Sequence, residues 1–314
     1  MGGWQPQTSR GLWYNKIKNK RGANMQTVGF IGIGVMGKSM AGHILDAGYP
    51  LHVYNRTAAK AQPLVDKGAV LAQSPKEVAQ NCDIVFTMLG FPVDVEDTYF
   101  NGEYGLLSFH KPGAALVDCT TSTPTLAVKI AQAAGQTGAL VLDAPVTGGD
   151  VGARNATLTM MCGGGQEAFE KCRPLLQLMA ASVSLMGGAG SGQHAKMCNQ
   201  IAIASGMLGM CEAIAYAQKS GLSAEQVLGC ISKGAAGSWS LSNYGPRILN
   251  GDFEPGFYIK HFVKDMKIAI DEANRLGVNL PGLQLAEKLY EELQAGGLGG
   301  KGTQALYLWY AGQQ

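Results

Sequence analysis

A glycine-rich segment at residues 32–37 constrains the fold of this chain more than any other sequence feature. It reads GIGVMG, the spacing GxGxxG, and stands after an apolar run at 27–33 and before a helix-like stretch at 36–47. In this context the first glycine permits a tight turn, the second lets a pyrophosphate approach the backbone, and the third lets the helix pack on the strand. The helix start favours an anion. The segment predicts a dinucleotide site, with an ordinary glycine-rich turn as the alternative. The cofactor-binding residues predicted from it are Gly32, Gly34, Val35, Met36 and Gly37.

Apolar runs alternate with helix-like stretches through the first half of the chain. The strand-like runs lie at 27–33, 51–54, 83–89, 114–118 and 139–143, and the helix-like stretches at 36–47, 58–67, 75–81 and 124–137. Two further strand-like runs, at 157–162 and 182–186, flank a helix-like stretch at 166–179. Short strands without polar alternation, separated by helices, are typical of a parallel sheet covered on both faces.

The character of the chain changes after the glycine-rich segment 187–192. From there the pattern is helical throughout, at 193–219, 223–232, 240–250, 261–276 and 281–295. We therefore predict an α/β Rossmann-like dinucleotide-binding domain at 25–188, followed by an all-α domain for substrate binding and oligomerisation at 189–314. A long interdomain helix that begins near residue 193 is expected to join them.

Residues 1–24 differ from the rest of the chain in charge. They carry five basic residues and no acidic one. We expect an extension that is disordered or foreign to the native protein, with a transit peptide as the minor alternative. Removing these five from the 25 basic residues leaves 20 against 23 acidic residues. The body of the chain thus lacks the basic excess of a nucleic-acid-binding protein.

The remaining composition excludes several classes of protein. Seven cysteines form no CxxC pair and five histidines form no HxxxH pair, so we expect no disulfide framework and no metal site. A cytoplasmic protein with buried thiols fits this usage. The apolar stretch Met197–Cys211 contains Asn199, Gln200 and Ser205, which predicts a buried helix rather than a membrane span. Glycine at 44 of 314 residues, with 15% charged residues, favours an oligomer.

The end of the second predicted strand indicates which dinucleotide is preferred. An NAD-selective site usually has an acidic residue there, on the ribose 2′-hydroxyl. This chain has Asn55, Arg56 and Thr57 instead, with Lys60 nearby. A guanidinium can fork onto a 2′-phosphate, so we predict NADP over NAD. If Arg56 is only a solvated loop residue, NAD use stays open. The predicted cofactor site also includes Met88 and Leu89, at the end of the run 83–89.

Three polar segments stand where ligands are expected. Asp118–Pro124 and Asp143–Gly149 begin at the carboxyl ends of predicted strands, where ligands bind in open α/β sheets. Lys196 and Asn199 are three residues apart in the predicted helix 193–219, so both project from one face. A lysine and an amide on one face of an otherwise apolar helix favour a functional site over a solvated surface.

These motifs resemble those of the 3-hydroxyisobutyrate dehydrogenase family, also called β-hydroxyacid dehydrogenases, over residues 26–310. The matching segments are GIGVMG at 32–37, DCTTSTP at 118–124, DAPVTGG at 143–149, GSGQHAKMCN at 190–199 and KHFVKDM at 260–266. The resemblance implies a Rossmann-like domain followed by an all-α domain through which dimers or tetramers form. It also implies interconversion of a β-hydroxy acid and its semialdehyde with NAD or NADP.

The resemblance further implies roles for single residues. Lys196 matches the catalytic lysine, which would take the hydroxyl proton in oxidation and return it in reduction. The implied substrate-binding residues are Thr121, Thr147, Gly148, Gly149 and Asn199, and the implied cofactor contacts are Thr121 and Lys264. The family often has serine at Thr147 and a second asparagine at Gln200. The second departure leaves open which amide touches the substrate.

The predicted function is an NAD(P)-dependent oxidoreductase that acts on a small carboxylate-bearing substrate. The alternatives are an NADPH-dependent glyoxylate or succinic semialdehyde reductase and a non-catalytic NADP-binding module. Trp239 is expected either to line the substrate pocket or to lie in the core. Lys264 either contacts the cofactor or forms an ion pair with Asp265.

Overall fold

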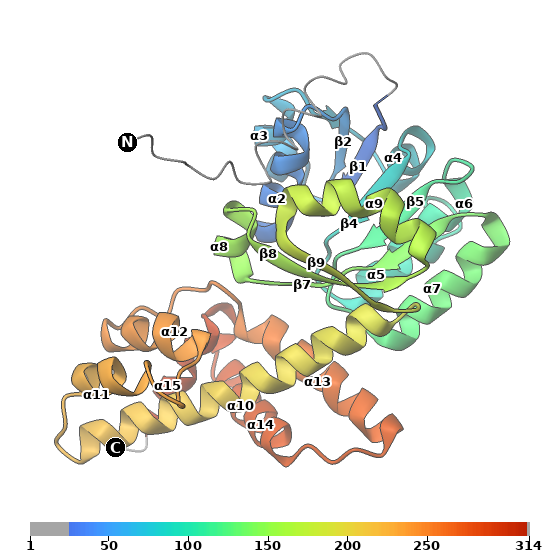
Figure 1. The fold of residues 1–314 in the computed structure, drawn as a ribbon. Coiled ribbons are helices and arrows are strands. Elements are labelled where there is room, and N and C mark those ends of the chain that lie inside the picture. The colour runs from blue at the N-terminus through green and yellow to red at the C-terminus, as the bar shows by residue number, and fades with distance from the viewer. Residues whose placement is uncertain (1–24, 313–314) are drawn as a thin grey trace, which may run out of the picture.

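The computed structural model describes residues 25–312, so the predictions for residues 1–24 lie outside the described part of the chain. Figure 1 shows a sheet with helices packed around it, a second domain made of helices, and one long helix that runs between them. This arrangement confirms the predicted fold class of a Rossmann-like domain followed by an all-α domain.

The first domain is built on one mixed sheet. Its strands are β1 (Val28–Ile31), β2 (Leu51–Tyr54), β3 (Val70–Leu71), β4 (Ile84–Thr87), β5 (Ala115–Asp118), β6 (Leu140–Asp143), β7 (Val146–Thr147), β8 (Leu158–Gly164) and β9 (Ala180–Gly187). The order is β3-β2-β1-β4-β5-β6-β8-β7, and β9 pairs with β8. The strands β1 to β6 are all parallel to one another, as predicted. β8 is antiparallel to β6 and β7, because a short strand and a short helix, rather than a long crossover helix, connect β6 to β8.

Helices cover both faces of this sheet. They are α2 (Val35–Asp46), α3 (Gln62–Val65), α4 (Pro75–Asn81), α5 (Pro92–Phe100), α6 (Leu106–Phe109), α7 (Pro124–Thr137), α8 (Gly149–Arg154) and α9 (Gln166–Met179). Phe30 and Phe86 lie in one core with α2 and α9. Val85 and Leu116 lie in a second core with α4 to α7. Alternate side chains thus enter opposite cores, which is why the strands read as continuous apolar runs.

Short elements account for most differences from the predicted pattern. The helix expected at 58–67 is a 3₁₀ turn, Ala58–Ala61, followed by the four-residue α3. β3 and β7, with two residues each, are too short to show any periodicity. The helices α5, α6 and α8 were not predicted either, and the longest of them has nine residues.

The second domain packs around one long helix. Its helices are α10 (Ser191–Lys219), α11 (Ala224–Ile231), α12 (Trp239–Leu249), α13 (Ile259–Leu276), α14 (Pro281–Ala295) and α15 (Leu306–Ala311). The core joins Met207 and Ile214 of α10 to Phe262 of α13 and Tyr290 of α14. Phe262 and Tyr290 meet edge to face, with ring centroids 5.1 Å apart.

α10 connects the two domains. Its first turns contact β8, β9 and α7, and the rest of the helix contacts α11 to α15 (Figure 1). Within the described residues, α10 alone has the length and hydropathy to cross a membrane, by composition only. Its buried side chains pack against other elements of the protein, as those of a core helix do.

Candidate active site

The glycine-rich loop between β1 and α2 has the geometry that a dinucleotide requires. A Cβ on Gly32, whose φ is +98°, would overlap the Met88 carbonyl oxygen and lie 3.2 Å from the Leu89 side chain. A Cβ on Gly37 would overlap the Gly32 carbonyl oxygen, so this glycine lets α2 pack against the end of β1. A Cβ on Gly34 would meet no atom within 4 Å. The fold requires the first and third glycines, while the space beside the second is open to a ligand.

The start of α2 leaves backbone N–H groups for a ligand. No side chain caps the helix at Gly34, and its first turn has no acidic residue. Asn55 holds the loop in place, because its Oδ1 accepts a hydrogen bond from the Ile33 N–H at 2.9 Å and its Nδ2 donates to the Thr57 carbonyl oxygen. Val35 is exposed and Met36 packs against the sheet core. This site therefore offers an anion both open space and uncapped donors.

A groove with a positively charged lining continues from the loop. It is lined by Ile33, Gly34, Val35, Lys38, Ala59, Lys60 and Pro63. Two of these residues are lysines and none is acidic. Arg56 lies on the surface with its side chain 82% exposed, and its Nη1 is 3.1 Å from Asp94 Oδ1. An exposed ion pair is worth little, so Arg56 can leave Asp94 for a phosphate.

Asp143, at the end of β6, fixes the start of α10. Its Oδ1 accepts a hydrogen bond from the Gly190 N–H at 2.8 Å, and its Oδ2 accepts one from the Gln193 N–H at 2.9 Å. A carboxylate at a helix N-terminus is electrostatically favourable. The backbones approach closely, since a Cβ on Gly163 would lie 2.6 Å from the Gly192 nitrogen. These contacts set the position of the next helical turn relative to the sheet.

Gln193 binds α10 to the polar loop after β5. Its side chain is fully buried. Nε2 donates to the Thr120 carbonyl oxygen at 2.8 Å, and Oε1 accepts from the Ser122 N–H at 3.0 Å. The residue between them, Thr121, accepts a hydrogen bond from Lys264 Nζ of α13 on its carbonyl oxygen at 2.5 Å. The loop is therefore held from both helices of the second domain that carry predicted site residues.

Lys196 and Asn199 lie one turn further along α10. The Lys196 side chain is only 6% exposed, and this burial lowers the pKa of its ammonium to about 8. The negative charge of Asp265 raises that pKa and the positive charge of Lys264 lowers it, both less than burial does. Lys264 Nζ is 2.9 Å from Asp265 Oδ1, which is the ion pair considered as an alternative. Lys264 Nζ also donates a hydrogen bond to the Thr121 carbonyl oxygen, and its contact with the cofactor stays a prediction.

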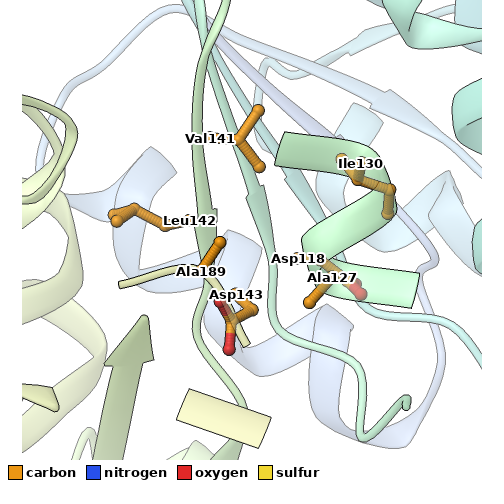
Figure 2. A pocket seen from close by; sticks show the side chains of 7 residues that line it. All are labelled: Asp118, Ala127, Ile130, Val141, Leu142, Asp143 and Ala189. Atoms are coloured by element: carbon orange, nitrogen blue, oxygen red, sulfur yellow. The ribbon is translucent and has the colours of Figure 1, made fainter. Parts of the chain in front are cut away.

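Two buried carboxylates stand at the ends of β5 and β6. Figure 2 shows Asp118 and Asp143 among the side chains that line a small cavity, the others being apolar. The volume of this cavity is about 10 Å³. Burial raises the pKa of Asp118 to about 6, and the charge of Asp143 also raises it. Hydrogen bonds from Thr120 and Thr87 lower this pKa, but by less than burial raises it. The cavity has room for about one water molecule, so it is not the substrate site.

The loop Thr147–Gly149 is placed differently from the other predicted substrate residues. It joins β7 to α8, and Gly148 and Gly149 have φ values of +122° and +62°. A Cβ on Gly149 would lie 4.0 Å from the carbonyl oxygen of Gly256, in the segment before α13. Among residues 25–312, no hydrogen bond joins this loop to Lys196 or Asn199. The loop thus lies next to the segment before α13.

Comparison with known proteins identifies the family. Residues 27–188 match the model described as the NAD binding domain of 6-phosphogluconate dehydrogenase, and residues 190–310 match NAD-binding of NADP-dependent 3-hydroxyisobutyrate dehydrogenase. The chain is 56% identical to "Uncharacterized oxidoreductase YkwC" of Bacillus subtilis over 90% of this chain and 99% of that protein. The chain belongs to the β-hydroxyacid dehydrogenase family. It is therefore an oxidoreductase of an NAD(P)-dependent hydroxyacid dehydrogenase family, as the motifs predicted.

Two further members illustrate the family. The chain is 50% identical to "Probable 3-hydroxyisobutyrate dehydrogenase-like 1, mitochondrial" of Arabidopsis thaliana, over 90% of this chain and 84% of that protein. The solved structure of Mycobacterium tuberculosis 3-hydroxyisobutyrate dehydrogenase with L-serine superposes with a TM-score of 0.83. The two chains are 30% identical, and the match covers 90% of this chain and 98% of the other.

Two residues at this β-hydroxyacid dehydrogenase site were missed from sequence. Gln193 and Asp265 each organise the site through side-chain hydrogen bonds or charge. Gln193 had a signal, because it lies three residues before Lys196 and so shares its helix face. Trp239 is 59% exposed, which excludes the core position considered for it. The part of the chain that the structure describes holds no cluster of three or more His, Cys, Asp or Glu suited to a metal.

Proposed function

We propose that this protein interconverts a small β-hydroxy acid and its semialdehyde, prefers NADP to NAD, and uses Lys196 as general acid and base. The observation that carries the proposal is the buried lysine whose pKa lies at about 8, on the same helix face as Asn199. Gln193 connects this helix to the loop that contains Thr121. A site of this kind can hold a substrate oxygen and exchange a proton with it.

The residues at the glycine-rich loop fit a nicotinamide dinucleotide. The open space beside Gly34 and the uncapped start of α2 suit a pyrophosphate. Lys38, Arg56 and Lys60 would hold a 2′-phosphate, which favours NADP. The match to a model described as NADP-dependent supports the same preference. When bound, the dinucleotide takes up or supplies the hydride.

Lys196 would exchange the proton that accompanies this reaction. In oxidation its neutral amine takes the proton of the substrate hydroxyl, and in reduction its ammonium gives a proton to the carbonyl oxygen. A lysine in water has a pKa of about 10.4 and is almost wholly charged at neutral pH. Burial brings the pKa of Lys196 to about 8, so both forms are accessible near neutrality.

The substrate would be held by groups on both domains. Asn199 would hold the hydroxyl or carbonyl oxygen beside Lys196. The Thr147 hydroxyl and the N–H groups of Gly148 and Gly149 would bind the carboxylate as a small anion nest. L-Serine, named with the Mycobacterium tuberculosis enzyme, carries a carboxylate and a β-hydroxyl, which supports this substrate class.

We also propose that the protein acts in the cytoplasm as a homodimer or homotetramer joined through the second domain. Large apolar side chains are exposed there, among them Tyr216 at 75%, Leu276 at 66% and Leu222 at 57%. We expect these side chains to lie in the contact between subunits, since contiguous apolar patches mark sites of association.

The proposal is tested by measuring NADPH and NADH consumption by the purified protein against a panel of small semialdehydes. We expect turnover of at least one semialdehyde, with kcat/KM about tenfold or more higher for NADPH, because charge-assisted bonds to the 2′-phosphate are worth about 1.5–3 kcal/mol. A preference for NADH would overturn the cofactor assignment. Tight NADPH binding without turnover of any substrate would favour a non-catalytic binding module.

A further inference from the structure

A chain of side-chain hydrogen bonds runs from the proposed substrate site to the buried Asp265. Asn199 Nδ2 donates to Gln200 Oε1 at 2.7 Å, and Gln200 Nε2 donates to Asp265 Oδ2 at 2.6 Å. The other oxygen of Asp265 is 2.9 Å from Lys264 Nζ. Gln200 and Asp265 are each 1% exposed, so the hydrogen bond between them is shielded from water. The chain thus crosses from α10 to α13.

The carboxylate at the end of this chain fixes the direction of every bond in it. A carboxylate paired with an ammonium can only accept hydrogen bonds. Gln200 must therefore turn its Nε2 toward Asp265 and its Oε1 toward Asn199. Because Gln200 Oε1 can only accept a hydrogen bond, Asn199 must turn its Nδ2 toward it as the donor. One N–H and the Oδ1 of the Asn199 amide take no part in these hydrogen bonds. The amide cannot flip to exchange its oxygen and nitrogen, because Nδ2 must face Gln200.

We propose that Gln200 is a positioning residue that fixes the orientation of the Asn199 amide for the substrate. The inference rests on the proposed function and extends it to a residue that departs from the family pattern. It also assigns the contact with the substrate to the amide of Asn199 rather than to that of Gln200. The Oε1 and Nε2 of Gln200 are both hydrogen-bonded within the protein. Asn199, partly buried beside Lys196, keeps one N–H and its Oδ1 for a ligand.

The length of the side chain at position 200 matters for this role. The two hydrogen bonds of Gln200, at 2.7 and 2.6 Å, are already short. A glutamine is therefore just long enough to reach both Asn199 and Asp265. Asparagine is shorter by one C–C bond, about 1.5 Å. The variant Gln200→Asn would therefore lose one end of the bridge and leave the Asn199 amide unfixed.

The experiment compares Gln200→Leu and Gln200→Asn with the wild type in semialdehyde reduction by NADPH. We expect kcat to fall about tenfold in both, because misplacement of a reacting geometry by a fraction of an ångström has effects of this order. The KM for NADPH should stay unchanged. The matched control is Met207→Ala, a buried apolar position about two turns after Gln200 on the same helix, which should lower the unfolding temperature but keep kcat. Wild-type kcat in Gln200→Leu would overturn the proposal.

A double variant separates positioning from a general loss of structure. If Gln200 acts through Asn199, then Gln200→Leu should change kcat less than about twofold in an Asn199→Ala background. An equal loss in both backgrounds would contradict the proposal.

A second readout does not depend on turnover. Selective ¹⁵N labelling of asparagine should show that one side-chain N–H of Asn199 exchanges slowly in the wild type and rapidly in Gln200→Leu. Rapid exchange in the wild type would overturn the hydrogen-bond chain itself. Slow exchange in a wild type without turnover would instead refute the proposed function, and with it the role of Gln200 in catalysis.

Discussion

Lys196→Ala is expected to lower kcat for semialdehyde reduction by about 10²–10⁴-fold, the range typical of general acid–base catalysis. The substituted enzyme would lack the group that gives a proton to the carbonyl oxygen. Folding should be retained, because Asp265 keeps its bonds to Lys264 and Gln200 when the Lys196 charge is removed. NADPH affinity should also be retained, since the glycine-rich loop is untouched.

The matched control for this substitution is Lys219→Ala. Lys219 lies on the last turn of the same helix and is exposed, so its loss should leave kcat unchanged. The measurement is kcat at saturating NADPH and semialdehyde, together with NADPH binding by fluorescence titration. A Lys196→Ala enzyme with kcat close to that of the wild type would exclude the lysine from proton transfer.

The second large effect is expected for Gly37→Ala. The added methyl group would overlap the Gly32 carbonyl oxygen, and neither backbone segment can yield without moving α2 away from β1. Overpacking of this kind costs about 1–3 kcal/mol of the free energy of unfolding. Because the shift displaces the N–H groups at the start of α2, NADPH affinity should fall about a hundredfold or more, as it would on loss of two or three charge-assisted hydrogen bonds.

Gly34→Ala serves as the comparison, because it separates binding from folding. Its methyl group would meet no protein atom within 4 Å, and the Gly34 φ of −84° is accessible to alanine. The unfolding temperature should therefore stay close to that of the wild type while NADPH affinity falls. Unchanged affinity in Gly34→Ala would mean that the dinucleotide does not lie against this glycine.

The sequence predicted those features that depend on local pattern. The buried strands read as apolar runs because both sheet faces are covered. The long helix was predicted correctly because it is apolar over most of its length, with only a few polar residues such as Lys196 and Asn199. The steric needs of Gly32 and Gly37 followed from the spacing of the motif and agree with the structure.

The features that escaped prediction depend on contacts between segments far apart in the chain. Gln193 reaches Thr120 across 73 residues, and Gln200 reaches Asp265 across 65. Gln193 shares the helix face of Lys196, but nothing in the local sequence indicates which distant group either glutamine binds. The reversal of β8 likewise depends on the path of a short connection rather than on the composition of the strand.

The measurement that tests the central claim most directly is the pH dependence of wild-type kcat/KM in both directions. The pKa of Lys196 lies at about 8, so reduction, which uses the charged lysine, should be flat below pH 8 and fall about tenfold per unit above it. Oxidation uses the neutral lysine, so its rate should rise about tenfold per unit up to pH 8 and then level off. The account predicts that the fall in reduction and the rise in oxidation share one pKa near 8 and that both are absent in Lys196→Ala. This result would establish the lysine as the proton-transfer group. Profiles without a break between pH 6.5 and 9.5 would contradict the account.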